Sequence, residues 1–106
     1  MKITPVNKAE VVVQKNGVKG QRIYDYNETI ANHITLTPGA RLDTHTTPVD
    51  VFFYVLEGKA WIEVGDERIA VESDSLIESP KDIPHAIENF SNTEILRVLV
   101  VKTPKT

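Results

Sequence analysis

The sequence contains no cysteine, which excludes disulfides, thiolate metal ligands and cysteine nucleophiles. It also has no apolar run of roughly eighteen residues, the length that a membrane-spanning helix needs. Residues 1–10 lack the apolar stretch of a signal peptide, so we predict a cytoplasmic protein without a membrane anchor. Twelve basic residues against fifteen acidic ones give a formal charge of -3, without a basic stripe. Nucleic acid is therefore not an expected partner.

A chain of 106 residues is long enough for one hydrophobic core, so we expect a single domain over residues 1–106. Short apolar or alternating segments recur along it, and turn residues separate them. No segment has a convincing helical pattern. This organisation predicts an all-β fold, either an antiparallel sandwich or a single β-barrel. The predicted strands cover residues 10–14, 22–26, 33–37, 51–56, 60–64, 68–72, 75–79, 85–90 and 94–101.

Two glycine-containing connections between predicted strands are short enough for tight hairpins. They lie at residues 57–59 (Glu-Gly-Lys) and 65–67 (Gly-Asp-Glu). Glycine adopts the backbone conformations that tight turns require, so we expect a hairpin at both places.

The predicted strand at residues 51–56 is apolar at every position, so both of its faces should be covered. The segment 94–101 is nearly as apolar. In a chain of this size the simplest cover for the second face is another subunit, and we predict a homodimer. The alternative is that the N-terminal strands fold over that face.

One segment combines glycine and histidine at a distinctive spacing. Gly39 is followed after five residues by His45, and Thr47, Val51 and Gly58 come next in the pattern. This spacing resembles the first motif of the cupin superfamily, which reads Gly, His, His, Glu, Gly. In that resemblance Thr47 replaces the second histidine and Val51 replaces the glutamate.

A second segment is similar to the second cupin motif, which reads Gly, Pro, Gly, His, Asn. Pro80, His85 and Asn89 match that motif, whereas Asp74 and Asp82 replace its two glycines. We expect Asn89 to fix the end of its strand rather than to contact a ligand.

The resemblance covers residues 34–101, with the first motif at about 39–58 and the second at about 74–89, and it implies a jelly-roll barrel. Cupins usually hold a divalent metal on three histidines and a glutamate, and the matching positions here are His45, Thr47, Val51 and His85. Only His45 and His85 are metal-ligand candidates, for zinc, iron, manganese, nickel or copper. Loss of the carboxylate removes the negative charge that offsets a divalent cation, so we expect weak or absent metal binding.

Four other residues are candidates to complete a site. Asp43 lies two residues before His45, Asp50 adjoins Val51, and Glu78 interrupts an apolar strand. Each of these acids is alternatively an exposed surface residue. His33 matches no motif position and is expected to be structural, although it is the third imidazole of the chain.

The remaining interior positions are expected to be apolar. Phe53 and Val55 continue the strand that begins at Val51, and Ile87 follows His85. Trp61 or Tyr54 is a candidate for the rim of a pocket. These side chains either line a small-molecule pocket or fill the barrel completely.

Three functions are compatible with this pattern. The first is binding of a small organic or anionic molecule near His45 and His85, with Thr47, Val51, Phe53 and Ile87 lining the site and little or no metal. The alternative is a metal-dependent enzyme, a dioxygenase or an isomerase, with His45 and His85 as ligands. The third is metal-free acid-base catalysis by the two histidines. The sequence leaves open whether the protein is an enzyme.

Overall fold

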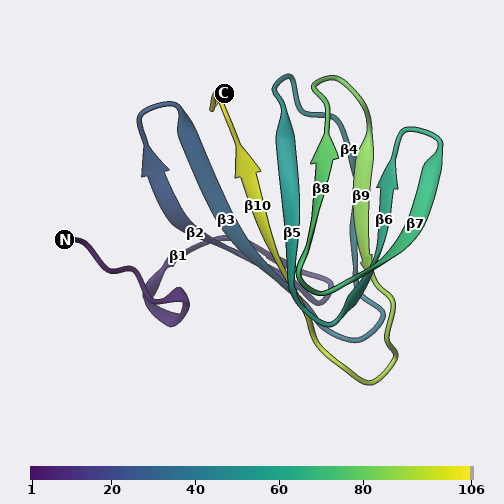
Figure 1. The fold of residues 1–106 in the computed structure, drawn as a ribbon. Coiled ribbons are helices and arrows are strands. Elements are labelled where there is room, and N and C mark those ends of the chain that lie inside the picture. Colours follow the sequence, from purple (N-terminus) through teal and green to yellow (C-terminus); the bar gives the residue numbers. More distant parts are fainter. Residues whose placement is uncertain (106) are drawn as a thin grey trace.

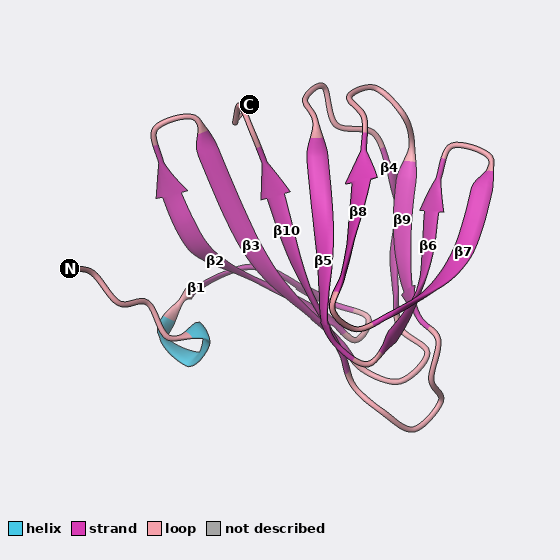
Figure 2. Cartoon of the chain, viewed as in Figure 1, coloured by secondary structure: helices cyan, strands magenta, loops and turns pink. Residues whose placement is uncertain are grey.

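The computed structural model describes residues 1–105, which form two antiparallel β-sheets packed face to face (Figure 1). The predicted all-β class is confirmed: the one helical element in this range is a short 3-10 turn, η1 (Val6–Lys8), as Figure 2 shows. No helix among these residues is long and apolar enough to cross a bilayer. The strands are β1 (Glu10–Lys15), β2 (Val18–Tyr26), β3 (Thr29–Leu36), β4 (Arg41–His45), β5 (Val51–Glu57), β6 (Lys59–Val64), β7 (Glu67–Glu72), β8 (Ser75–Ser79), β9 (His85–Asn89) and β10 (Leu96–Lys102).

The six-stranded sheet has the order β1-β2-β3-β10-β5-β8, and the four-stranded sheet has the order β4-β9-β6-β7. All paired neighbours are antiparallel. The chain passes repeatedly from one sheet to the other, as in the jelly-roll sandwich that was predicted. β7 and β8 are the last strands of their sheets and do not pair with each other, so the sheets are not joined along that side.

All nine predicted strands are present, and one further strand, β4, was not predicted. β4 has the sequence Arg-Leu-Asp-Thr-His and contains a single apolar residue, Leu42. Three of its five residues are exposed, so it lacks the hydrophobic pattern that identifies a strand in a sequence.

Gly58 lies at a corner between the sheets rather than in a hairpin. It connects β5 to β6, which belong to different sheets, so the hairpin predicted at 57–59 is wrong. Its φ is 89°, and an added Cβ would lie 2.6 Å from the carbonyl oxygen of Ile95. Glycine is needed here because the backbone of another segment passes too close for a side chain. The predicted hairpin at Gly65 does connect the paired strands β6 and β7.

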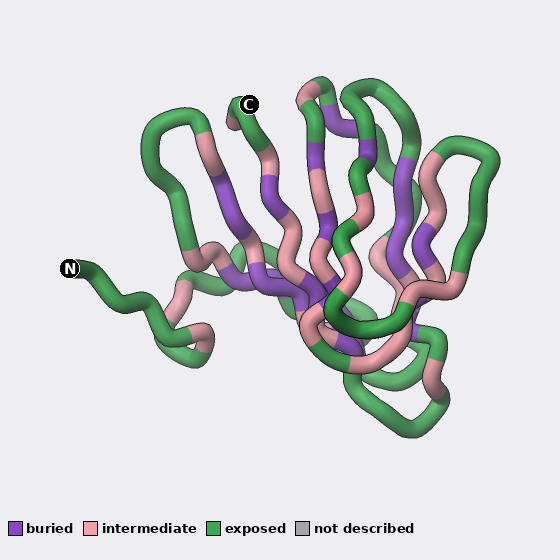
Figure 3. Tube along the Cα trace, in the orientation of Figure 1, coloured by how far each residue is buried: buried purple, intermediate pink, exposed green. Residues whose placement is uncertain are grey.

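Side chains that point between the two sheets form the core (buried segments in Figure 3). On β5, the buried residues Val51, Phe53 and Val55 alternate with half-buried ones, which is the two-residue period of a strand. Ile62 of β6 and Ile87 of β9 face them from the four-stranded sheet and are also buried.

The strands splay apart at one end of the sandwich, the upper end in Figure 1. The loops at residues 46–50 and 80–84, the β2–β3 and β6–β7 turns and the C-terminal residues all lie at this end. We call it the open end. It is the end at which His45 concludes β4 and His85 begins β9.

The outer face of β5 is only half-buried within one chain, at Phe52, Tyr54 and Leu56. The N-terminal segment does not cover it, contrary to the alternative considered from the sequence. Instead Gln21 on β2 donates a hydrogen bond from Nε2 to the carbonyl oxygen of Val6, at 2.6 Å. Since β3 and β10 separate β2 from β5 in the sheet, this segment lies away from β5.

Candidate functional site

The two motif histidines lie side by side at the open end, on paired strands of the four-stranded sheet. His45 of β4 is the direct partner of His85 of β9, and His85 is also opposite Val64 of β6. Directly opposite residues of antiparallel strands project from the same face of the sheet. Because His85 is only 3% exposed, this row lies on the inner face of the sheet, with His45 exposed at the open end and Val64 half-buried.

A second row faces it from the six-stranded sheet. Lys102 of β10 is the direct partner of Ile30 on β3 and of Val51 on β5, and Val51 is opposite Ser79 on β8. Val51 and Ser79 are 4% and 1% exposed, so this row also points inward. The site therefore has one wall from each sheet.

The imidazoles of His45 and His85 are in direct contact. Their Nε2 atoms are 3.0 Å apart, and their rings meet edge to face at an interplanar angle of 88°. The Ser79 hydroxyl oxygen lies 2.7 Å from Nδ1 of His85 and so links the two sheets. Nδ1 of His45 is 3.1 Å from the carbonyl oxygen of Asp43. Phe53 packs edge to face on the His85 ring, with centroids 5.2 Å apart.

These contacts define one consistent arrangement of protons for the neutral pair. A carbonyl oxygen only accepts hydrogen bonds, so Nδ1 of His45 must donate to Asp43. Neutral His45 then accepts at Nε2, from the Nε2–H of His85. Nδ1 of His85 is left as the acceptor for the Ser79 hydroxyl. In this arrangement neither imidazole has a free lone pair.

Burial and neighbouring charge keep His85 neutral. Burial is the main cause that lowers the pKa of His85 from 6.5 to about 4, and nearby His45 and Lys102 lower it in the same direction. A cationic imidazolium at this position would lose its hydration and be repelled by Lys102. His85 is thus a neutral hydrogen-bonding group at pH 7.

Lys102 brings a positive charge to the same wall as Val51. Its side chain is half-buried, and no carboxylate of residues 1–105 forms an ion pair with it. A cation that protein carboxylates leave uncompensated makes the surrounding interior attractive to an anion. Ser79 and Lys102 are the two site residues that the sequence reasoning missed. Strand alternation contained a signal for both, because Ser79 shares a face with Ile77, and Lys102 with Val100 and Val98.

The structure brings most of the predicted lining residues into the interior. Val51, Phe53 and Ile87 are buried on inward-facing positions of β5 and β9. Thr47 is also buried, in the loop that follows β4, and its carbonyl oxygen accepts a hydrogen bond from the backbone of Asp82.

Among residues 1–105, no side chain considered for completing a metal site is placed with the two histidines to hold a metal ion. The Asp43 side chain is 87% exposed and lies 3.7 Å from Arg41. Asp50 accepts a hydrogen bond from the backbone of Lys81, at 2.9 Å. Glu78 is exposed on the outer face of β8, because inward-facing Ile77 and Ser79 flank it.

His33 is a buried structural residue on a different face. It lies on the outer face of β3, since its neighbour Ile34 belongs to the core. Nε2 of His33 accepts a hydrogen bond from Arg97, at 3.1 Å. Burial, followed by the charge of Arg97, lowers the pKa of His33.

The two aromatic residues suggested for a pocket rim are elsewhere, so that prediction is wrong. Trp61 alternates with the buried residues Ala60 and Ile62 and therefore lies on the outer face of β6, where Arg68 stacks on its ring. Tyr54 lies on the outer face of β5, and its hydroxyl donates to Asp74 at 3.4 Å.

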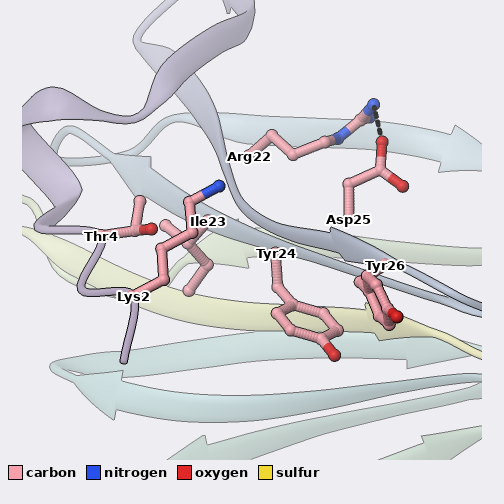
Figure 4. A pocket seen from close by; sticks show the side chains of 7 residues that line it. All are labelled: Lys2, Thr4, Arg22, Ile23, Tyr24, Asp25 and Tyr26. Atoms are coloured by element: carbon pink, nitrogen blue, oxygen red, sulfur yellow. Dashed lines mark ion pairs between the residues drawn. The ribbon is translucent and has the colours of Figure 1, made fainter.

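The hollow drawn in Figure 4 is separate from the histidine pair. It has a volume of about 480 Å³ and lies between the N-terminal segment and β2. Arg22 and Asp25 form an ion pair in it, and Tyr24 and Tyr26 are exposed at its side. It contains no histidine and no buried polar group, so we do not assign it a role.

The backbone supports the alignment of the two histidine motifs. Gly39 and Gly58 have positive φ values of 73° and 89°, and Asp74 and Asp82 have values of 63° and 65°. Aspartate is among the few residues other than glycine that tolerate this conformation. The turns of the second motif are thus retained although its glycines are replaced.

Asn89 has the structural role that was predicted, and this is confirmed. Its Nδ2 lies within 2.8–3.1 Å of three backbone carbonyl oxygens, those of Leu36, Thr37 and Glu94. Its Oδ1 accepts a hydrogen bond from the backbone of Ser91. The side chain therefore ties the end of β9 to two other segments.

A family model described as "Cupin domain" matches residues 32–102, which is more than half of the chain. The chain belongs to the cupin family. No curated protein matches it. Many solved structures do match it.

Three of these structures illustrate the similarity. An RmlC-like cupin from Shewanella frigidimarina has 18% identity and a TM-score of 0.85, with 98% of this chain and 91% of that chain covered. TT1209 from Thermus thermophilus has 21% identity and a TM-score of 0.85, with both chains fully covered. KdgF from a Halomonas species has 14% identity and a TM-score of 0.86, with 100% and 96% covered. At such low identities the similarity shows the fold alone.

The donor set does not fit the metal site that this family implies. Two imidazoles are present, but Thr47 and Val51 occupy the other two positions, and valine offers no donor atom. Within residues 1–105 no group of three or more His, Cys, Asp or Glu side chains is placed to hold a metal ion. The charged group on the facing wall is the Lys102 ammonium, which opposes a bound cation rather than supporting it.

Proposed function

We propose that the open end of this cupin binds a small anionic molecule, a carboxylate in the simplest case, without a metal ion. The observation that carries the proposal is the position of Lys102, on an interior wall that faces the hydrogen-bonded pair His45 and His85. An ammonium group contributes a charge-assisted hydrogen bond to a carboxylate, and such bonds are about twice as strong as neutral ones.

The residues around Lys102 also favour an anionic ligand. Val51, beside Lys102, stands where a metal-binding cupin would carry glutamate, so no carboxylate at that position repels an incoming anion. The Nε2–H of His85 donates to His45, and we propose that it becomes the second donor to the ligand when the ligand displaces the His45 ring. Phe53 and Ile87 are each 1% exposed, and Phe53 packs on the His85 ring, so the low dielectric of the interior strengthens these interactions.

A metal-dependent dioxygenase or isomerase is less well supported. Two of its four expected ligands are absent, and both imidazoles already use their lone pairs within the Ser79–His85–His45 series. The metal-dependent function and metal-free anion binding therefore predict different experimental results.

The test is an NMR titration of the untagged, chelator-treated protein with acetate, at constant ionic strength and neutral pH. The chain has three histidines, so each imidazole can be followed separately. We expect saturable shifts at His45 and His85 and none at His33, which lies on the outer face. Replacing Lys102→Met should weaken binding about tenfold, by loss of a charge-assisted hydrogen bond.

The matched control is Lys59→Met, since Lys59 pairs with Glu72 at the surface, and it should bind acetate like the wild type. Equal shifts at all three histidines, or no difference between the two lysine variants, would contradict the proposal.

We also propose that two copies associate through the outer face of β5 and β10. Phe52, Tyr54 and Leu99 are only half-buried there, and the N-terminal segment lies away from them. Light scattering coupled to gel filtration should give twice the monomer mass of 11.9 kDa. Phe52→Glu should give monomers, and a monomeric wild type would contradict the proposal.

A further inference from the structure

The sandwich has an apolar groove beside the histidine pair that the proposed function does not use. It runs between β7 and β8, the unpaired last strands of the two sheets, and has a volume of about 780 Å³. This is within the range of ligand-binding cavities in proteins, about 300–1,000 Å³. Its apolar lining includes Val64, Ile69, Val71, Leu76, Ile77 and Ile83.

The groove exposes an unusual amount of apolar surface. Ile69 is 55% exposed, Leu76 is 54% exposed and Ile83 is 38% exposed. Large apolar side chains scattered singly on a surface need no explanation, but several that line one groove indicate a binding site.

The groove adjoins the proposed anion site through three of its lining residues. Val64 is the direct strand partner of His85 and projects from the same face. Ile77 is the direct partner of Phe53, whose ring contacts His85. Pro80 follows Ser79, whose hydroxyl is bonded to His85. The groove and the histidine pair are therefore separated by no more than these neighbouring side chains.

The distribution of charge determines the orientation in which a molecule that spans the groove and the anion site binds. The groove carries three acidic residues, Asp66, Glu67 and Glu78, and no basic residue. Lys102 lies on the interior side, on the wall that faces the histidines. An anionic group is attracted to the interior end and repelled by the groove, so the part that occupies the groove carries no negative charge, and the apolar lining favours a hydrocarbon there.

We infer that the ligand is an amphiphilic monocarboxylate, whose carboxylate binds at Lys102 and His85 and whose uncharged hydrocarbon tail lies in the β7–β8 groove. This inference rests on the proposed function and adds the class of ligand to it. Burial of each additional methylene of the tail then strengthens binding.

The test compares acetate, butyrate, hexanoate and octanoate in the same NMR titration. Affinity should rise about three- to fourfold for each added methylene that the groove covers. The double variant Ile69→Gln/Ile83→Gln should lose most of this dependence on chain length and still bind acetate. Both side chains are partly exposed, so the variant is expected to fold.

Ile95→Gln is the matched control, because Ile95 is 41% exposed in the loop before β10 and does not line the groove. It should keep the full dependence on chain length. Acetate binding with an affinity that does not change with chain length would overturn this inference and leave the proposed function intact. Absence of binding by every acid in the series would overturn both. Conversion of dimers to monomers by the double variant, without a chain-length effect, would instead assign the groove to a second copy of the chain.

Discussion

Strands β4, β9 and β6 carry a polar cluster on each of their two faces, and the clusters differ in charge balance. On the outer face, Arg41 lies 2.7 Å from Glu63 and 3.1 Å from Glu88, and Arg68 lies 2.6 Å from Glu63. On the inner face the cluster is the hydrogen-bonded series of Ser79, His85 and His45, with Lys102 on the wall opposite.

The outer cluster is complete without a ligand, whereas the inner cluster is not. Arg41 is the main cause that lowers the pKa of Glu63 to about 2, so the charges outside satisfy one another. Inside, Lys102 has no carboxylate partner among residues 1–105. Self-compensating charges indicate a structural role, and an uncompensated, half-buried charge indicates a place where an anion can bind.

The largest difference between the two faces should appear when an aromatic residue is removed from each. Phe53 is 1% exposed beneath His85, and Phe53→Ala should lower the free energy of unfolding by about 3–5 kcal/mol. Trp61→Ala removes a half-exposed ring on the outer face and should cost about 1–2 kcal/mol. Urea unfolding of both variants measures the two costs. Equal costs would mean that the inner wall is not a packed surface.

Acidification should weaken the two clusters in separate pH ranges. The folded pKa of His85 is about 4 and its ordinary value is 6.5, so the unfolded chain binds the proton more readily. The stability that neutral, buried His85 contributes is fully present above pH 6.5. As the pH falls toward 4 this contribution is lost, which lowers the free energy of unfolding by up to about 3 kcal/mol. Glu63 has a lowered pKa, so its contribution is lost only as the pH falls from 4.5 toward 2.

Urea unfolding across this pH range checks both windows. His85→Gln should reduce the loss of unfolding free energy between pH 6.5 and 4. Glu63→Gln should leave the loss in this pH range unchanged. His33→Gln is the necessary control, because the pKa of His33 is lowered as well. Protonation of His33 therefore also lowers the free energy of unfolding as the pH falls below 6.5. An unchanged profile in His85→Gln would contradict the assignment of a buried, neutral His85.

The smallest effect belongs to the outer ion pairs. These side chains are partly exposed, so Glu63→Gln should cost only about 0.5–1 kcal/mol, and added salt should reduce the difference from the wild type. Acetate affinity in Glu63→Gln should equal that of the wild type, as measured by the same NMR titration. A loss of affinity would show that the two faces are coupled.

The sequence predicted the fold and the histidine pair because both depend on spacing. Strand alternation and the positions of His45 and His85 relative to Gly39 and Asn89 are local patterns that the fold preserves. Strand β4 was not predicted. Its residues are mostly exposed, so its sequence does not have the alternating hydrophobic pattern of a half-buried strand.

The rest of the site depends on strand pairing, which spacing does not reveal. Lys102 faces the histidines because β10 pairs with β5 across a separation of about fifty residues in sequence. Ser79 reaches His85 from the other sheet. Glu78 was the candidate considered in the same strand, yet alternation places it outside. Tyr54 and Trp61 were misplaced for the same reason, since their neighbours in the sequence take the inward positions.

The most direct test of a metal-free site is the nitrogen-15 imidazole spectrum of the untagged protein, purified without added metal and recorded at neutral pH. We predict that neutral His85 carries its proton on Nε2 and neutral His45 on Nδ1, with no change on addition of a chelator. Metal-bound signals from Nε2 of both histidines that disappear with the chelator would contradict this prediction, and would make the half-complete ligand set a working metal centre.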